Sequence, residues 1–257
     1  MSLDIGRAVT YPFEDAQWRA KLLPLLILSF IPGLNVLTWG GYAISVARNL
    51  TRREKYPLAT WDEWSDILVR GLLSWVAMLV YFLPAIIVGG CFLSLSLVFG
   101  ERVESSSFIA MRCLAYLLSL AYLFFTNFVL NAGHLNFVRT DQFSGYLDLP
   151  ARFRDLRRGG SRILTLTVLQ VVLVLLIGLL IIVGGVVFLV CINIAVRTGG
   201  IAVVIVVPIL LIALVALLAL MTLAFLAHGY FIGGTSILIA RQAMPAPESL
   251  PEMQSTS

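Results

Sequence analysis

Charged residues are nearly absent from four long stretches of this sequence. The stretches are residues 71–99, 108–138, 163–196 and 201–240, and Arg112 is the single Asp, Glu, Lys or Arg within them. Each stretch is longer than the ~20 residues that a helix needs to cross ~30 Å of bilayer hydrocarbon. The sequence therefore predicts four transmembrane helices.

The same scarcity excludes several kinds of chemistry. No carboxylate lies in the four stretches, which argues against an intramembrane aspartyl protease, a carboxylate proton relay and an acidic cation site. Cys91, Cys113 and Cys191 lack CxxC spacing, and the chain has two histidines, so we expect packing cysteines and no metal site. A Walker loop, an HExxH motif and a GxSxG elbow are also missing. We expect no enzyme activity and no cofactor.

The composition fits a membrane protein built as one unit. The hydrophobic fraction is 60% and the charged fraction 12%, whereas a soluble domain carries roughly 25% charge. We expect an all-α polytopic transmembrane bundle over residues 1–241, followed by a flexible tail over residues 242–257. The sequence pI of about 9.1 reflects basic residues spread along the membrane edge without a nucleic-acid motif, so no nucleic-acid partner is expected.

Basic residues alternate between the connections. One side carries Arg48, Arg52, Arg53, Lys55, Arg70, Arg139, Arg152, Arg154, Arg157, Arg158, Arg162 and Arg241, and the other carries Arg102, Arg112 and Arg197. Because cytoplasmic loops carry the excess of Lys and Arg, the first and third connections and the C-terminus are predicted to be cytoplasmic.

The stretch over residues 22–46 allows two interpretations. Pro24, Pro32 and Gly33 interrupt it, and proline inside a helix removes a backbone hydrogen bond and kinks or breaks the helix. The segment is either a kinked fifth span or a re-entrant hairpin of two half-helices. Charge favours the hairpin, because Arg19 and Lys21 then lie on the cytoplasmic side.

The two basic connections predict interfacial helices. Thr60 and Glu63 have capping-box spacing, which predicts a helix from Trp61 with Trp64 on the same face. Pro150 predicts a helix start in the third connection. The candidate contacts to lipid headgroups or a partner are Trp61, Trp64, Arg152, Arg154, Arg157 and Arg158.

A few polar residues lie within the predicted spans. Asn127, Asn131 and His134 are spaced four and three apart, which places them on one face of a helix. His228 lies near mid-membrane in the last span. Such residues either hold helices together by hydrogen bonds or mark a substrate path. Gly229 and Gly233 have the GxxxG spacing that allows close helix packing.

Aromatic and glycine positions at the membrane boundaries resemble a known family. They are Tyr11, Phe13, Trp18, Gly41, Tyr42, Arg48, Leu58, Trp61, Asp62, Trp64, Asp66, Gly71, Phe137, Thr140, Phe143 and Phe153. This pattern is similar to domain of unknown function 4013, a group of uncharacterised multi-pass membrane proteins of bacteria and archaea, from about residue 11 to residue 241. The resemblance implies a location in a prokaryotic cytoplasmic (inner) membrane and no established activity.

Two functional interpretations remain. The preferred one is a non-enzymatic accessory or scaffold protein that contacts membrane lipids or another membrane protein. The alternative is a small transporter or channel that uses the broken N-terminal segment and the stripe of Asn127, Asn131 and His134.

Overall fold

The computed structural model describes residues 5–99, 106–197 and 203–243, and this part of the chain is helical without strands. Its elements are α1 (Ile5–Thr10), η1 (Tyr11–Glu14), α2 (Trp18–Leu28), α3 (Leu34–Thr51), η2 (Trp61–Glu63), α4 (Trp64–Phe99), α5 (Ser106–Thr140), α6 (Ser144–Leu147), α7 (Leu149–Arg197) and α8 (Val203–Ala243). The predicted all-α polytopic bundle is confirmed.

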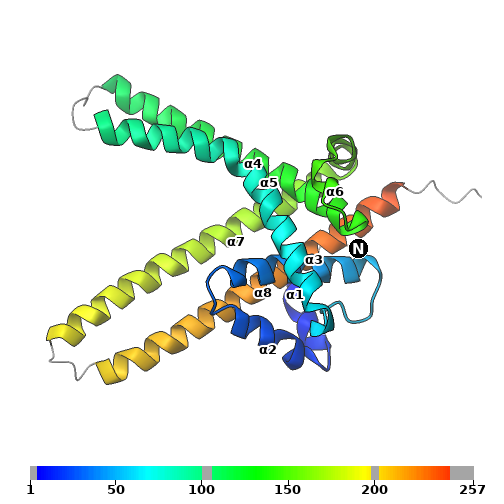
Figure 1. Cartoon of the computed structure of the whole chain (residues 1–257), viewed down its shortest axis with the longest axis horizontal. Helices are drawn as coiled ribbons and strands as arrows, with labels where there is room; N and C mark the ends of the chain where they lie inside the picture. Colours follow the sequence, from blue (N-terminus) through cyan, green and yellow to red (C-terminus); the bar gives the residue numbers. More distant parts are fainter. Residues whose placement is uncertain (1–4, 100–105, 198–202, 244–257) are drawn as a thin grey trace, which may run out of the picture.

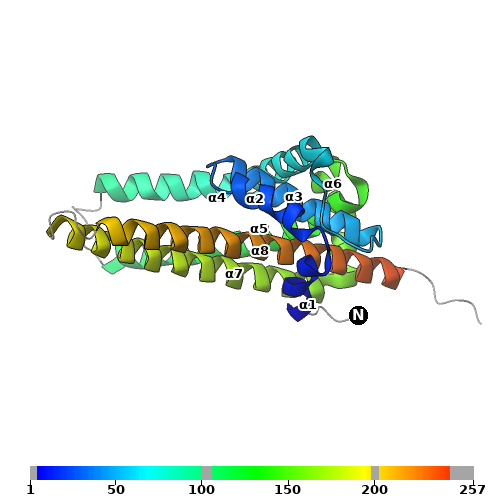
Figure 2. The same cartoon turned by 90° about the horizontal axis from the view of Figure 1, so that it is seen from below.

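Four long apolar helices form two arms. Each of α4, α5, α7 and α8 is long and apolar enough to cross a membrane. Figure 1 shows α4 with α5 in one arm and α7 with α8 in the other, and the arms diverge away from the end that holds α6. Figure 2 shows α7 and α8 side by side along their length. Residues 179–190 of α7 are all exposed, as expected of helix surface that faces lipid.

The stretch with the prolines is a hairpin of two helices. The chain turns between α2 and α3 at Gly33, whose φ of +85° favours glycine. Both open ends of the hairpin contact the loop that precedes η2: Lys21 Nζ donates to Leu58 O, and Asn49 Nδ2 donates to Pro57 O. The turn lies well short of the far ends of the arms (Figure 1). The structure therefore decides in favour of the hairpin over the kinked fifth span.

The core surrounds α3, which packs between α4 and α8. From Thr38 to Ala47, every residue of α3 except Gly40 is buried. A Cβ added at Gly41 would overlap the carbonyl oxygen of Ile67 in α4. The middle of α3 is therefore surrounded by protein, whereas residues 30–33 at the turn of the hairpin are exposed.

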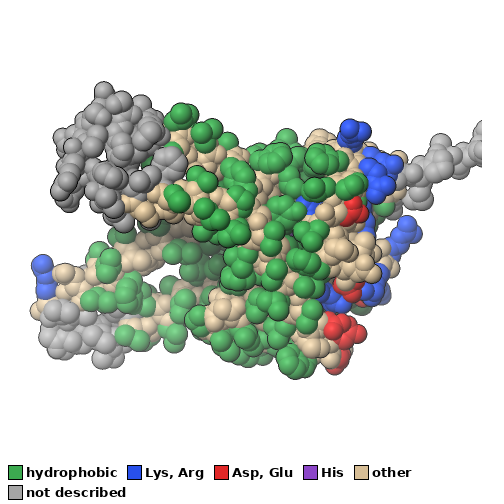
Figure 3. All heavy atoms as spheres, turned by 45° about the horizontal axis from the view of Figure 1, so that its top comes forward, with side chains coloured by type: hydrophobic (Ala, Val, Ile, Leu, Met, Phe, Trp, Pro, Cys, Tyr) green, Lys and Arg blue, Asp and Glu red, His purple; other side chains and the backbone are tan. Residues whose placement is uncertain are grey.

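Charged side chains gather at one end of the molecule, which we call the basic end (Figure 3). Here Asp141 forms ion pairs with Arg48 of α3 and Arg70 of α4, and Asp155 of α7 accepts two hydrogen bonds from Arg139 of α5 at 2.9 and 3.0 Å. Asp141 thus links α3 to α4, and Asp155 links α5 to α7. The ion pairs of the basic end therefore connect helices of both arms at the end where the arms meet.

Local details differ from the sequence-based expectations. The predicted capping box does not form: the Thr60 side chain makes no capping hydrogen bond, and the chain passes through the 3₁₀ turn η2 before α4 begins at Trp64. A helix does begin beside Pro150, but it runs on into the third span through a break at Gly159 (φ −136°, ψ 22°). Of the predicted tail, residues 242 and 243 belong to α8, and residues 244–257 lie outside the described residues.

Candidate functional site

Five side chains from four helices meet just inside the basic end. This polar cluster consists of Ser74 and Tyr81 of α4, His134 of α5, Tyr146 of α6 and Arg152 of α7. Tyr146 is fully buried, and its hydroxyl lies 2.9 Å from Ser74 Oγ and 2.8 Å from His134 Nδ1. Burial raises the pKa of the Tyr146 phenol above its usual value, and the Ser74 hydrogen bond counteracts part of that rise. The phenol is therefore neutral at physiological pH and can donate or accept.

Arg152 is the charged member of the cluster, and its side chain is 1% exposed. Its Nη1 donates to the Tyr81 hydroxyl, which in turn donates to the Tyr146 carbonyl oxygen at 2.8 Å. The guanidinium carbon lies 5.0 Å from the centre of the Tyr81 ring. Nε and Nη2 are buried and have no hydrogen-bond partner among the residues that the structure describes.

The charge of Arg152 is not compensated by an acidic residue. No described Asp or Glu forms an ion pair with it, in contrast to Arg139, which pairs with Asp155. Burying an ion costs several kcal/mol in a real protein, whereas a desolvated cation–π contact returns about 2 kcal/mol. Arg152 is therefore a buried cation with two donors available to an anion.

The predicted polar stripe splits between several contacts. Asn131 Nδ2 donates to Thr167 Oγ1 at 3.0 Å and to Gln170 Oε1 at 2.9 Å, which links α5 to α7. Asn127 donates to the carbonyl oxygen of Leu123 in its own helix. His134 enters the polar cluster.

His228 of α8 contributes a second imidazole to this region. The centres of the His134 and His228 rings are 6.3 Å apart, with the rings nearly perpendicular. The structure thus brings one predicted residue of the stripe next to His228.

The predicted headgroup contacts occupy two environments. Trp64 is 59% exposed, and Arg154, Arg157 and Arg158 are exposed on the first turns of α7. Trp61, by contrast, donates from Nε1 to Lys21 O at 2.7 Å and packs against the core. With Arg152 also buried, four of the six candidates are available at the surface.

The GxxxG glycines of α8 pack directly against α3. A Cβ added at Gly229 would overlap the carbonyl oxygen of Ala43, and one at Gly233 would lie 2.8 Å from the carbonyl oxygen of Ala47. Both glycines are buried. The two backbones can approach this closely only because these positions have no side chain.

Sequence reasoning missed most of the polar cluster. Tyr81 is a polar residue in an apolar stretch, a signal that could have been read. Ser74 and Tyr146 carry no such signal, because serine is common in spans and Tyr146 lies in a predicted connection between two spans. Arg152 could not be told from its exposed neighbours, since its burial depends on where α6 and α4 pack.

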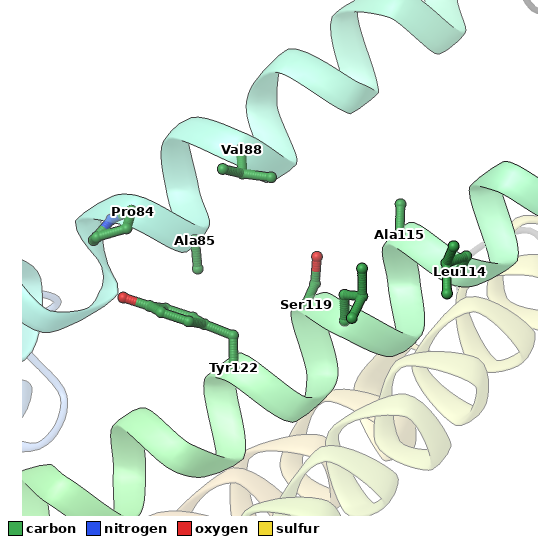
Figure 4. Close-up of a pocket in the computed structure, with 8 residues that line it drawn as sticks. Pro84, Ala85, Val88, Leu114, Ala115, Ser119 and Tyr122 are labelled. Atoms are coloured by element: carbon green, nitrogen blue, oxygen red, sulfur yellow. The ribbon is translucent and has the colours of Figure 1, made fainter.

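An apolar groove of about 360 Å³ lies between α4 and α5, on the side of the polar cluster away from the basic end. Its lining residues are Pro84, Ala85, Val88, Leu114, Ala115, Leu118, Ser119 and Tyr122. Figure 4 shows the side chains of Ala85 and Val88 facing those of Ala115 and Ser119 across the groove. Leu114 and Leu118 are more than half exposed, so the groove opens at the surface of the arm.

Four apolar spans, a re-entrant hairpin and a buried polar cluster define a multi-pass all-α membrane protein. The sequence model of the family described as "Protein of unknown function (DUF4013)" matches residues 25–193, which is more than half of the chain. The chain belongs to this family, and the resemblance noted in the sequence is confirmed. Comparison with curated proteins and with solved structures gave no match.

Proposed function

We propose that this protein is a non-enzymatic membrane scaffold or accessory protein, which acts through helix packing and through contacts of its basic end with anionic lipid headgroups or a membrane partner. The observation that carries this proposal is the use of Asn131. Both of its amide hydrogen bonds go to α7, which is what a residue that holds helices together does.

The surface of the basic end supports the lipid contact. Arg154, Arg157 and Arg158 are exposed beside Phe153, whose side chain is 61% exposed. Basic side chains next to an exposed aromatic ring suit a membrane interface, where each basic residue attracts anionic lipid by about 1 kcal/mol. In this proposal the basic end and the C-terminus face the cytoplasm of a prokaryotic cell, in accordance with the excess of Lys and Arg.

One observation favours a transporter or channel as the second candidate. The hairpin of α2 and α3 turns partway along the arms (Figure 1), and broken helices of this kind form substrate sites in transporters. In this alternative the path would pass His134 and His228, whose rings are neighbours.

A flux screen in proteoliposomes distinguishes the two. For the scaffold we expect no uptake or conductance above that of empty liposomes, and an Asn131→Ala variant that is less stable in detergent. Flux that disappears on replacing His134 would instead establish the transporter.

The lipid contact has its own measurement. Purified protein should retain an excess of anionic over zwitterionic lipid, and replacing Arg154, Arg157 and Arg158 together by Gln should reduce that excess. An unchanged lipid composition would contradict the headgroup contact without touching the packing role.

A further inference from the structure

Arg152 presents two hydrogen-bond donors for which the described part of the chain supplies no acceptor. Nε and Nη2 are both buried, and the side chain as a whole is 1% exposed. A guanidinium offers adjacent N–H groups in a planar fork, which matches two oxygens of a phosphate or carboxylate. The hydroxyls of Tyr81 and Tyr146 lie in the same cluster, where Tyr81 donates to the Tyr146 carbonyl oxygen and Tyr146 is hydrogen-bonded to Ser74 and His134.

The apolar groove continues from this cluster along the same pair of helices. Pro84, Ala85 and Val88 follow Tyr81 by three, four and seven residues, which places all four on one face of α4. Across the interface, the Tyr122 hydroxyl of α5 donates to the Tyr81 carbonyl oxygen at 3.1 Å. Tyr122, which lines the groove, is therefore hydrogen-bonded to the backbone of a residue of the polar cluster.

The order of these features along the bundle matches that of a lipid in one leaflet. His134 of the polar cluster precedes Arg139 of the basic end by five residues, which is about 7.5 Å along α5. The groove begins beyond the cluster and runs toward the far end of the arm. A phosphate near the basic end and an acyl chain pointing away from it would meet the cluster first and the groove second.

We propose that the polar cluster and the α4–α5 groove form one binding site for a phospholipid, with the phosphate held by Arg152 and an acyl chain in the groove. The Tyr81 hydroxyl, which now accepts from Arg152, is replaced by a phosphate oxygen when the lipid binds. The site deepens the lipid contact proposed above and rests on it, but it concerns a single bound lipid and not the surface arginines.

Arg152 could bind inorganic phosphate as well as a phospholipid, but the groove favours the phospholipid. The lining residues of the groove are apolar apart from one serine and one tyrosine, so the groove itself adds no charged contact for a free anion. A chain of methylene groups, in contrast, gains favourable contacts along its length.

Three probes separate the contributions of phosphate and chain in the delipidated full-length protein. They are phosphatidylglycerol, diacylglycerol with the same chains, and inorganic phosphate, each titrated by native mass spectrometry or thermal shift in a neutral detergent. We expect phosphatidylglycerol to bind the wild type more tightly than either of the other two.

The charge is tested by Arg152→Gln, with Arg52→Gln as the matched control because it removes the same charge from an exposed position outside the surface contact proposed above. Loss of a charge-assisted contact should weaken phosphatidylglycerol binding by about 10- to 100-fold. The control should weaken it by at most about fivefold. Without lipid, Arg152→Gln should melt at or above the wild-type temperature, because a buried unpaired charge has been removed.

The groove is tested by Ala85→Trp, which fills it, against Ala121→Trp, which adds the same ring at an exposed position of α5 outside it. We expect only Ala85→Trp to weaken phosphatidylglycerol binding, and this arm tests the site even where Arg152→Gln fails to fold.

Equal effects of the two arginine variants would overturn the Arg152 site and leave the surface contact of the proposed function standing. Inorganic phosphate binding as tightly as phosphatidylglycerol, together with equal effects of the two tryptophan variants, would reassign the site to a free anion.

Discussion

Replacing Gly41 by alanine should destabilise the bundle, because the new Cβ has no room between α3 and α4. It would overlap the carbonyl oxygen of Ile67 and lie 2.9 Å from the backbone nitrogen of Gly71. These are backbone atoms, which cannot rotate away, so the two helices must separate. Overpacking costs about 1–3 kcal/mol, while the better helix propensity of alanine returns up to ~1 kcal/mol. Because the overlap is with backbone atoms, the cost should lie in the upper part of its range, and we expect a net loss of about 1–2 kcal/mol.

The measurement is thermal unfolding of the purified protein in detergent, followed by circular dichroism. A loss of this size lowers the melting temperature by about 2–8 °C in a chain of this length. The matched control is Gly184→Ala in α7, where an added Cβ meets nothing within 4 Å. The control should melt at or slightly above the wild-type temperature. If Gly41→Ala is as stable as Gly184→Ala, the close packing of α3 on α4 is wrong.

Three further predictions follow from other parts of the molecule. Asn131→Ala should lower the free energy of unfolding by about 1 kcal/mol, at ~0.6 kcal/mol for each of its two interhelix hydrogen bonds. Asn127→Ala should lower it by less, because it breaks only a bond within its own helix. Equal losses of the two variants in chemical unfolding would contradict this prediction. Burial alone would raise the pKa of the Asp15 carboxyl, but hydrogen bonds and the charge of a neighbouring lysine lower it overall. Its stabilisation is therefore present above the unfolded pKa of about 3.9 and is lost as the pH falls through the lower folded value, so the difference in melting temperature between wild type and Asp15→Asn should vanish in acid and persist at neutral pH. Finally, cysteines at the exposed positions Gln17 and Glu54 should be labelled by an impermeant reagent from the same side of the membrane, whereas labelling from opposite sides would restore the kinked fifth span.

Hydropathy was sufficient to predict the spans, because in a bilayer every backbone polar group must be bonded internally and long apolar segments have no alternative to helices. The helix type and the four long helices follow from that constraint. The hairpin was harder to predict from the sequence, because Pro24, Pro32 and Gly33 predict a break in the helix but not the direction of the chain after the break. Packing of α3 between α4 and α8, together with the shared contacts of both hairpin ends on the loop near Leu58, decided that direction.

The candidate site shows the same division. The sequence by itself determined which residues are polar within the membrane, and it marked Asn131 and His134 because their spacing is fixed by the helix period. Only the tertiary structure decided that Arg152 is buried while Arg154 and Arg158 are exposed. The four arginines on the first turns of α7 have the same hydropathy and charge. Their burial differs because other helices pack over one face of α7, and such contacts between segments far apart in the chain are decided only by the tertiary structure.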